Sequence, residues 1–261
     1  MLDFKHSKGE MTRPRMRDRG IYVLPNLFTI GALFAGFYSI VQAMNSSWEH
    51  AAVAIFIAMV LDGLDGRVAR MTGTQSVFGA ELDSLSDMVS FGVAPALVMY
   101  VFALKGLGKF GWIAAFVFCA GAALRLARFN TQLEVADKRF FQGLPSPAAA
   151  ALVAGFVWVM VEYGISGPEV AWLASAVILF AGISMVTNLK FYSGKEINLR
   201  KSVPFFVVLL IVLFFILVST SPPEVLLIMF TLYALSGYVH ATWRWLHRKE
   251  KAAAHLPEEK K

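Results

Sequence analysis

The chain has 261 residues, of which 57% are hydrophobic and only 16% are charged, and its mean hydropathy is +0.60. This composition excludes a water-soluble domain and indicates an integral membrane protein. The formal net charge of +6 does not indicate a nucleic-acid partner, because the basic residues lie in short segments between apolar runs and suit an anionic membrane surface. The single cysteine, Cys119, excludes an intramolecular disulfide and a cysteine metal cluster.

Residues 1–24 form a basic N-terminal segment on the cytoplasmic side. We expect it either to lie along the lipid headgroups or, in its first half, to be a disordered tail. The apolar run that follows, 27–44, has a long charged leader and enough residues to span a bilayer. It therefore predicts a retained helix and not a signal peptide.

Regularly spaced apolar runs predict an all-α membrane protein with about eight transmembrane helices, since about 20 residues, rising about 1.5 Å each, cross a hydrocarbon core of roughly 30 Å. The expected spans are 27–44, 50–71, 78–104, 110–130, 146–163, 168–188, 203–219 and 223–243. Lys and Arg gather in alternate loops, which places both termini in the cytoplasm under the positive-inside rule. Residues 25–190 are expected to form the transmembrane core, 191–243 a cytoplasmic loop with two additional transmembrane helices, and 244–261 a charged cytoplasmic tail.

The first helix is predicted to start at Pro25, because a proline at that position loses no intrahelical hydrogen bond. Asn26 and Thr29 follow and could cap the free N–H groups of the first turn. Their polar groups could equally reach a nucleotide at the cytoplasmic mouth of the protein. Both interpretations stay open at this point.

Four aspartates stand beside or inside the second and third apolar runs: Asp62, Asp65, Asp83 and Asp87. A carboxylate at membrane depth is costly, about 2.5–3.5 kcal/mol for Asp at a helix centre, and is kept mainly for function. Steps of three and four residues put each pair on one helix face. If the two faces meet, multivalent cations must lie between them, and oxygen-only ligands favour Mg²⁺, Mn²⁺ or Ca²⁺. A pair of such ions is the usual arrangement for displacement at phosphorus.

Small residues and one arginine accompany these aspartates. Gly66, Ala69 and Gly79 remove side-chain bulk, so that a large ligand can lie against the backbone. Arg70 offers a planar, permanently charged group for a phosphate. The pattern therefore indicates a substrate that carries phosphates.

The eight residues resemble, in identity and spacing, the signature of the CDP-alcohol phosphotransferases, membrane enzymes that move a phosphoalcohol group from a CDP-linked donor to an alcohol: Asp62, Asp65, Gly66, Ala69, Arg70, Gly79, Asp83 and Asp87. The resemblance implies a six-helix catalytic core, two divalent cations (Mg²⁺ or Mn²⁺, with Ca²⁺ as an alternative) near the cytoplasmic face, and a homodimer. The alternative is that the aspartates cap helices or pair with Arg67 and Arg70.

The linker after Arg70 contains several hydroxyl groups and free N–H groups that could hold phosphate oxygens. The family resemblance favours Ser76 among them. Turn formation alone would also explain Thr, Gly and Ser in this place.

Two later segments carry basic residues on the same side of the membrane as the aspartates. Arg125 and Arg128 end the fourth helix in the sequence RLARFN, and Tyr192 and Lys195 follow the sixth. They are predicted to bind the acceptor or a lipid phosphate, although membrane anchoring explains them equally well. Together with the sequence FQGLPSPAAA, these segments resemble the phosphatidylserine synthase branch of the family.

The predicted reaction follows from this resemblance. CDP-diacylglycerol would be bound by Asp62, Gly66, Ala69, Arg70, Ser76 and Gly79, with Asn26 and Thr29 at the nucleotide, and L-serine would accept the phosphatidyl group. Asp87 is the candidate general base. The alternatives are another acceptor, such as glycerol 3-phosphate or an inositol phosphate, a divalent-cation transporter, and a structural scaffold.

Overall fold

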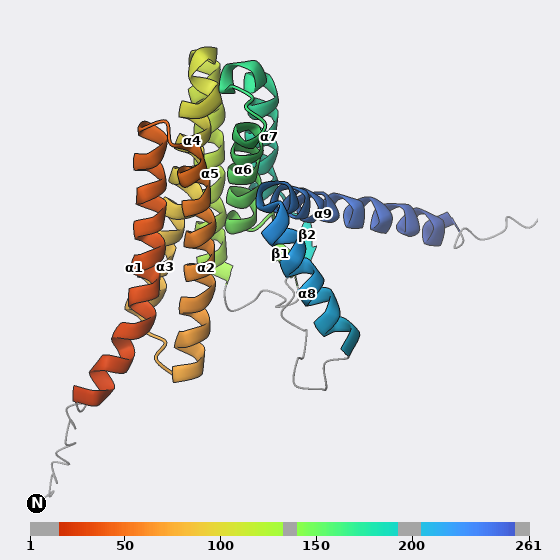
Figure 1. Ribbon diagram of the computed structural model, residues 1–261. Coiled ribbons are helices and arrows are strands. Elements are labelled where there is room, and N and C mark those ends of the chain that lie inside the picture. Colours follow the sequence, from red (N-terminus) through yellow and green to blue (C-terminus); the bar gives the residue numbers. More distant parts are fainter. Residues whose placement is uncertain (1–15, 133–139, 193–204, 254–261) are drawn as a thin grey trace, which may run out of the picture.

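The computed structural model describes residues 16–132, 140–192 and 205–253, and these are almost entirely helical (Figure 1). The long helices are α1 (Met16–Met44), α2 (Trp48–Thr72), α5 (Lys109–Gln132), α6 (Ser146–Glu162), α7 (Ala171–Val186), α8 (Phe205–Thr220) and α9 (Pro222–Ala253). Every predicted span has a helical counterpart. The prediction of an all-α membrane protein is confirmed, with one short sheet that the sequence did not indicate.

The first helix does not begin where the sequence suggested. Pro25 lies inside α1, which begins at Met16, so part of the basic N-terminal segment is helical. A proline within a helix leaves the carbonyl four residues earlier without its usual donor, and helices commonly bend there. Figure 1 shows the first turns of α1 bending away from the bundle. The prediction that Pro25 starts the helix is therefore wrong.

The third span is not one regular α-helix. It comprises α3 (Val77–Asp87), the π-helix η1 (Met88–Val93), α4 (Ala94–Met99), the π-helix η2 (Tyr100–Leu104) and the 3₁₀ turn η3 (Lys105–Leu107). Wide π-helical turns are rare, and they occur frequently at functional sites. Here the first one begins directly after Asp87, one of the predicted ligands.

Small side chains let the helices of the core approach closely. Most of α6 is buried, with Ala149, Ala150 and Ala151 fully covered by neighbouring helices. A Cβ atom built on Gly36 of α1 would lie 2.5 Å from Ser90 Oγ of η1, so only glycine allows this contact. The close contact brings α1 and the third span together beside the aspartates.

A two-stranded antiparallel sheet lies below the lower ends of α6 and α7, next to α9 (Figure 1). Strand β1 (Phe140–Gln142) pairs with β2 (Lys190–Tyr192), so that Phe141 faces Phe191 in register. Gly143 then turns the chain with φ of 76°, a conformation that favours glycine, and leads into α6. The sheet thereby joins the segments that precede α6 and follow α7.

The last two helices differ from the others. Figure 1 shows α9 lying across the bundle instead of along it, with α8 leading to it. The side chains of α8 that the structure describes are largely exposed and almost all apolar. An apolar surface of this kind suits lipid or another protein chain.

Among the described residues, five helical segments are long and apolar enough to cross a membrane: Leu24–Met44, Val77–Leu107, Lys109–Thr131, Gly167–Val186 and Pro222–Arg244. Two shorter apolar helices, Ser146–Glu162 and Phe206–Thr220, accompany them. Helix α2 is absent from this set, and it is the helix that carries Asp62, Asp65, Arg67 and Arg70. The protein is an integral membrane protein, and a helix with too many charged residues to be counted among these spans carries two of the four predicted aspartates.

Candidate active site

Three of the predicted aspartates meet where α2 and α3 come together. Asp62 comes from α2, and Asp83 and Asp87 lie one turn apart on α3. One carboxylate oxygen from each lies within 4.8 Å of the others. We call these three residues the acidic cluster. The positions of these three carboxylates therefore agree with the prediction that the acidic faces of the two helices meet.

The acidic cluster has the properties of a cation site. Asp83 Oδ1 and Asp87 Oδ1 are buried and have no hydrogen-bond partner in the part of the chain that the structure describes. Buried charged oxygens without partners are strongly unfavourable unless a counter-ion compensates them. Carboxylates that converge in this way fit one or more divalent cations with a preference for oxygen ligands.

Asp65 takes a different partner from the other three aspartates. Its side chain is only 5% exposed, and its Oδ2 accepts a hydrogen bond of 2.6 Å from Thr29 Oγ1 of α1. It remains close enough to Asp83 for their charges to interact. Thr29, predicted to touch a nucleotide, thus orients a carboxylate beside the acidic cluster.

Helix α1 also supports the acidic cluster from behind. Ser86 Oγ donates to the carbonyl of Thr29 at 3.1 Å, and Ser90 Oγ donates to the carbonyl of Ala32 at 3.0 Å. Both serines are buried and lie close to Asp87 in the sequence. These hydrogen bonds fix α3 and η1 against α1, and so fix the position of the Asp87 backbone.

The residues predicted to bind the nucleotide lipid form two small groups next to the aspartates. A Cβ atom on Gly79 would lie 3.1 Å from Ser76 Oγ and 3.3 Å from Asn26 Oδ1, which places these three residues together. Ser76 caps α3, because its Oγ accepts a hydrogen bond of 3.0 Å from the Gly79 N–H. The structure thus supports the capping interpretation for Ser76, and capping does not prevent contact with a substrate.

The second group lies on the last turns of α2. The guanidinium of Arg70 extends past Gly66, where a Cβ atom would lie 3.6 Å from its Nη1. Arg70 is exposed, and Gly66 and Ala69 are partly exposed. Ala69 also accepts the N–H of the capping residue Gly73. This exposed arginine above small residues is accessible to a phosphate.

Arg125 of α5 lies close enough to the acidic cluster for its charge to interact with Asp87 and Asp62. Its Nη1 donates a hydrogen bond of 2.8 Å to Ser146 Oγ at the start of α6. Its Nε is buried and has no hydrogen-bond partner among the described residues, so one donor remains for a ligand.

The other predicted acceptor residues have different surroundings. Arg128 donates to the carbonyl of Val186 at 3.1 Å and to Asn188 Oδ1 at 3.2 Å, which ties α5 to the end of α7. Tyr192 ends strand β2, and its carbonyl accepts a hydrogen bond of 3.1 Å from the hydroxyl of Tyr233 in α9. Lys195 lies outside the described residues.

Sequence reasoning did not find three contributors to this region. Ser146 binds Arg125, Tyr233 interacts electrostatically with Arg125, and Asn130 Nδ2 donates to Ser84 Oγ at 3.0 Å beside Asp83. The polar motif RLARFN does contain Asn130, but its spacing says nothing about a partner on α3. No periodicity in α9 links Tyr233 to a residue more than a hundred positions earlier.

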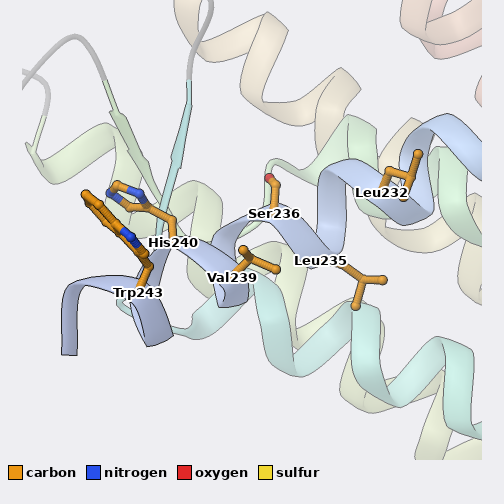
Figure 2. Close-up of a pocket in the computed structure, with 6 residues that line it drawn as sticks. All are labelled: Leu232, Leu235, Ser236, Val239, His240 and Trp243. Carbon is orange, nitrogen blue, oxygen red and sulfur yellow. The ribbon is translucent and has the colours of Figure 1, made fainter. Parts of the chain in front are cut away.

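A separate pocket lies on the outer face of α9 (Figure 2). It is lined by Leu232, Leu235, Ser236, Val239, His240 and Trp243. The His240 ring stacks against Trp243, with ring centroids 6.4 Å apart. These side chains all come from one helix and none is acidic, so this pocket suits apolar chains better than a diphosphate.

Comparison with known proteins agrees with this site. The model of the CDP-alcohol phosphatidyltransferase family matches residues 22–183, which contain the acidic cluster and Arg125. A CDP-diacylglycerol–serine O-phosphatidyltransferase of Helicobacter pylori strain J99 is 36% identical over 233 residues, covering 89% of this chain and 98% of that protein.

Two further relatives have the same name and come from other organisms. The protein from Methanocaldococcus jannaschii is 42% identical over 137 residues, covering 52% of this chain and 61% of its own length. The protein from Saccharomyces cerevisiae is 39% identical over 139 residues, covering 48% of this chain and 50% of its own length.

Proposed function

This chain belongs to the CDP-alcohol phosphatidyltransferase family, and we propose that it transfers the phosphatidyl group of CDP-diacylglycerol to L-serine, giving phosphatidylserine and CMP. The observation that carries the proposal is the convergence of Asp62, Asp83 and Asp87 close to a partly buried arginine, Arg125. The relatives named as serine phosphatidyltransferases support the choice of donor and acceptor.

The acidic cluster would hold two divalent cations, Mg²⁺ or Mn²⁺, with Asp65 as a fourth carboxylate. The buried, unpartnered oxygens of Asp83 and Asp87 support this assignment. When bound, the cations would neutralise negative charge on the diphosphate and on the departing phosphate. The Thr29 hydroxyl holds Asp65 in a fixed orientation by donating to its Oδ2.

The donor lipid would lie over the C-terminal turns of α2 and the start of α3. Arg70 binds a phosphate oxygen, while Gly66 and Ala69 leave room beside the backbone. Asn26, Ser76 and Gly79 lie together at the start of α3 and contact the cytidine end of the donor. The acyl chains extend into the bilayer beside the apolar outer faces of the helices.

The reaction is a displacement at phosphorus. The serine hydroxyl oxygen forms a bond to the phosphorus attached to diacylglycerol, while the bond from that phosphorus to the bridging oxygen of CMP breaks. Asp87 accepts the hydroxyl proton, and CMP leaves with the bridging oxygen. Ser86 and Ser90, on either side of Asp87 in the chain, hold α3 and η1 against α1, so that the Asp87 carboxylate stays at the reacting atoms.

Arg125 would bind the serine carboxylate. It lies beside Asp87, and its buried Nε has no partner among the described residues. One guanidinium can satisfy one carboxylate, whereas a phosphorylated acceptor requires additional cations. Arg128 already donates to Val186 and Asn188, which favours serine over glycerol 3-phosphate or an inositol phosphate.

The site would face the cytoplasm, where soluble serine is available. Arg67, Arg70, Arg125 and Arg128 are all near the helix ends at the aspartate side of the bundle, in agreement with the positive-inside rule. The homodimer implied by the family resemblance stays a prediction, and the apolar surfaces of α8 and α9 offer area for it.

The test is CMP release from purified protein in detergent or liposomes with CDP-diacylglycerol and Mg²⁺ or Mn²⁺. We expect release that depends on L-serine and produces labelled phosphatidylserine. Release with glycerol 3-phosphate or inositol phosphate, and none with serine, would move the protein to another acceptor. Uptake of Mn²⁺ into proteoliposomes without any transfer would instead support a transporter.

A further inference from the structure

Helix α9 lies beyond residues 22–183, the part that the family model matches, yet its inner face reaches the acceptor side of the site. The Tyr233 hydroxyl donates to the carbonyl of Tyr192 at 3.1 Å. The Tyr233 ring packs against Phe191, with centroids 5.9 Å apart. Strand β2 is therefore held to α9 by one hydrogen bond and one ring contact.

Helix α9 and strand β2 are packed closely against each other. Phe191 is completely buried, and its ring lies so close to Gly237 that a Cβ atom there would overlap it. The turn of α9 between Tyr233 and Gly237 is thus fixed relative to the strand. The Tyr238 hydroxyl also forms a hydrogen bond of 2.7 Å with Ser184 Oγ of α7.

Strand β2 also connects α9 to the residues that hold Arg125. It pairs with β1, and the residues that follow β1 are held by hydrogen bonds of 2.9 Å from the Gly143 N–H to Leu189 and from the Leu144 N–H to Ser184. Two residues after Leu144, Ser146 Oγ accepts a hydrogen bond from Nη1 of Arg125. The Tyr233 phenol also interacts electrostatically with Arg125 directly.

We propose that Tyr233 is a positioning residue for the acceptor: through strand β2 and Ser146 it holds the Arg125 guanidinium in the orientation that binds the acceptor carboxylate. This inference rests on the proposed function and names a residue outside the family-matched region. Tyr233 touches neither donor nor phosphorus. Its loss should therefore weaken acceptor binding and leave the chemical step and donor binding intact.

The test compares Tyr233→Phe with Thr242→Val in the full-length protein. Both remove one hydroxyl from α9, and the Thr242 hydroxyl donates to carbonyls of its own helix. We expect Tyr233→Phe to raise the KM for serine about threefold to tenfold, the range for one lost hydrogen bond, with kcat and the KM for CDP-diacylglycerol within about twofold. Thr242→Val should leave all three constants within about twofold of the parent.

A double substitution provides the second readout. If Tyr233 acts through Arg125, Tyr233→Phe in an Arg125→Lys background should add no further increase in the KM for serine. An unchanged KM for serine in Tyr233→Phe, an equal increase in Thr242→Val, or independent effects in the double variant would each overturn the inference.

Failure of the proposed function and failure of this inference give different results. If the parent protein releases no CMP with serine, the proposed function fails, whatever the variants do. If Tyr233→Phe yields no folded protein, Ser146→Ala tests the same chain of contacts from its other end. It should raise the KM for serine selectively, and an unchanged value there would also overturn the inference.

Discussion

The two halves of the candidate site are built in different ways. The acidic cluster comes from two consecutive helices, and its members lie within 26 positions of one another, from Asp62 to Asp87. The acceptor region, which we define as Arg125, Ser146 and Tyr233, gathers residues from α5, α6 and α9.

This difference separates the binding of cations and diphosphate from the choice of acceptor. Holding cations and a diphosphate requires fixed carboxylates at fixed spacing, and one helix pair can supply them. Choosing among acceptor alcohols requires contacts that can change without moving those carboxylates. An acceptor region that depends on distant segments allows such change, because α9 and the sheet can be altered while α2 and α3 stay in place.

The largest effect is expected at the acidic cluster. Asp87→Asn removes the candidate base and a charged oxygen from a buried site, so the transfer rate should fall about 10²- to 10⁴-fold. Glu81→Gln, at an exposed position of the same helix, is the matched control and should be nearly silent. The measurement is the rate of CMP release at saturating serine. A folded, cation-loaded Asp87→Asn protein with a normal rate would remove Asp87 from the mechanism.

The acceptor region should respond differently. Arg125→Lys retains a charge but loses the planar group, so the KM for serine should rise about 10- to 150-fold, corresponding to about 1.5–3 kcal/mol for hydrogen bonds to a charged group. The KM for CDP-diacylglycerol should change little. Arg67→Gln, an exposed arginine on α2, serves as the control. Equal increases in both KM values would show that the two halves are not separate.

Loss of the hydrogen bond between Thr29 and Asp65 should have a smaller effect on activity. Thr29→Val removes the hydrogen bond of 2.6 Å to Asp65 and leaves a buried carboxylate oxygen without that donor. We expect the free energy of unfolding to fall by about 1–3 kcal/mol. More Mg²⁺ or Mn²⁺ should be needed for half-maximal activity. Thr220→Val, whose hydroxyl donates within its own helix, is the control. An unchanged cation requirement would indicate that Asp65 does not take part in cation binding.

The packing of α1 against the third span can be tested by a pair of glycines. Gly36→Ala would place a methyl group 2.7 Å from Ser90 Cα and should destabilise the protein by about 1–3 kcal/mol. Gly63→Ala in α2 has no described atom within 4 Å of its new methyl group, and should stabilise the helix by about 0.5–1 kcal/mol. Thermal unfolding in detergent measures both. Effects of the same sign would contradict the proposed close contact.

Several features of the fold could be predicted because they depend on local chemistry. Apolar runs located every long helix, since a bilayer requires about 20 apolar residues in each span. The start of α1 could not be located in this way. Pro25 is favourable at a helix start, but in this protein the helix continues through it. The π-helix after Asp87 and the β1–β2 sheet gave no periodic signal in the sequence either.

The sequence by itself determined the class of the protein and the four aspartates from which the acidic cluster is drawn, because hydropathy and helical spacing act over short stretches of chain. It also determined that Asp83 and Asp87 share a helix face. Only the tertiary structure decided that Asp65 turns to Thr29, that Arg125 comes close enough to Asp87 for their charges to interact, and that Tyr233 of α9 does the same with Arg125. Those contacts join residues 36 to more than a hundred positions apart. They depend on how whole helices pack, which no local pattern encodes.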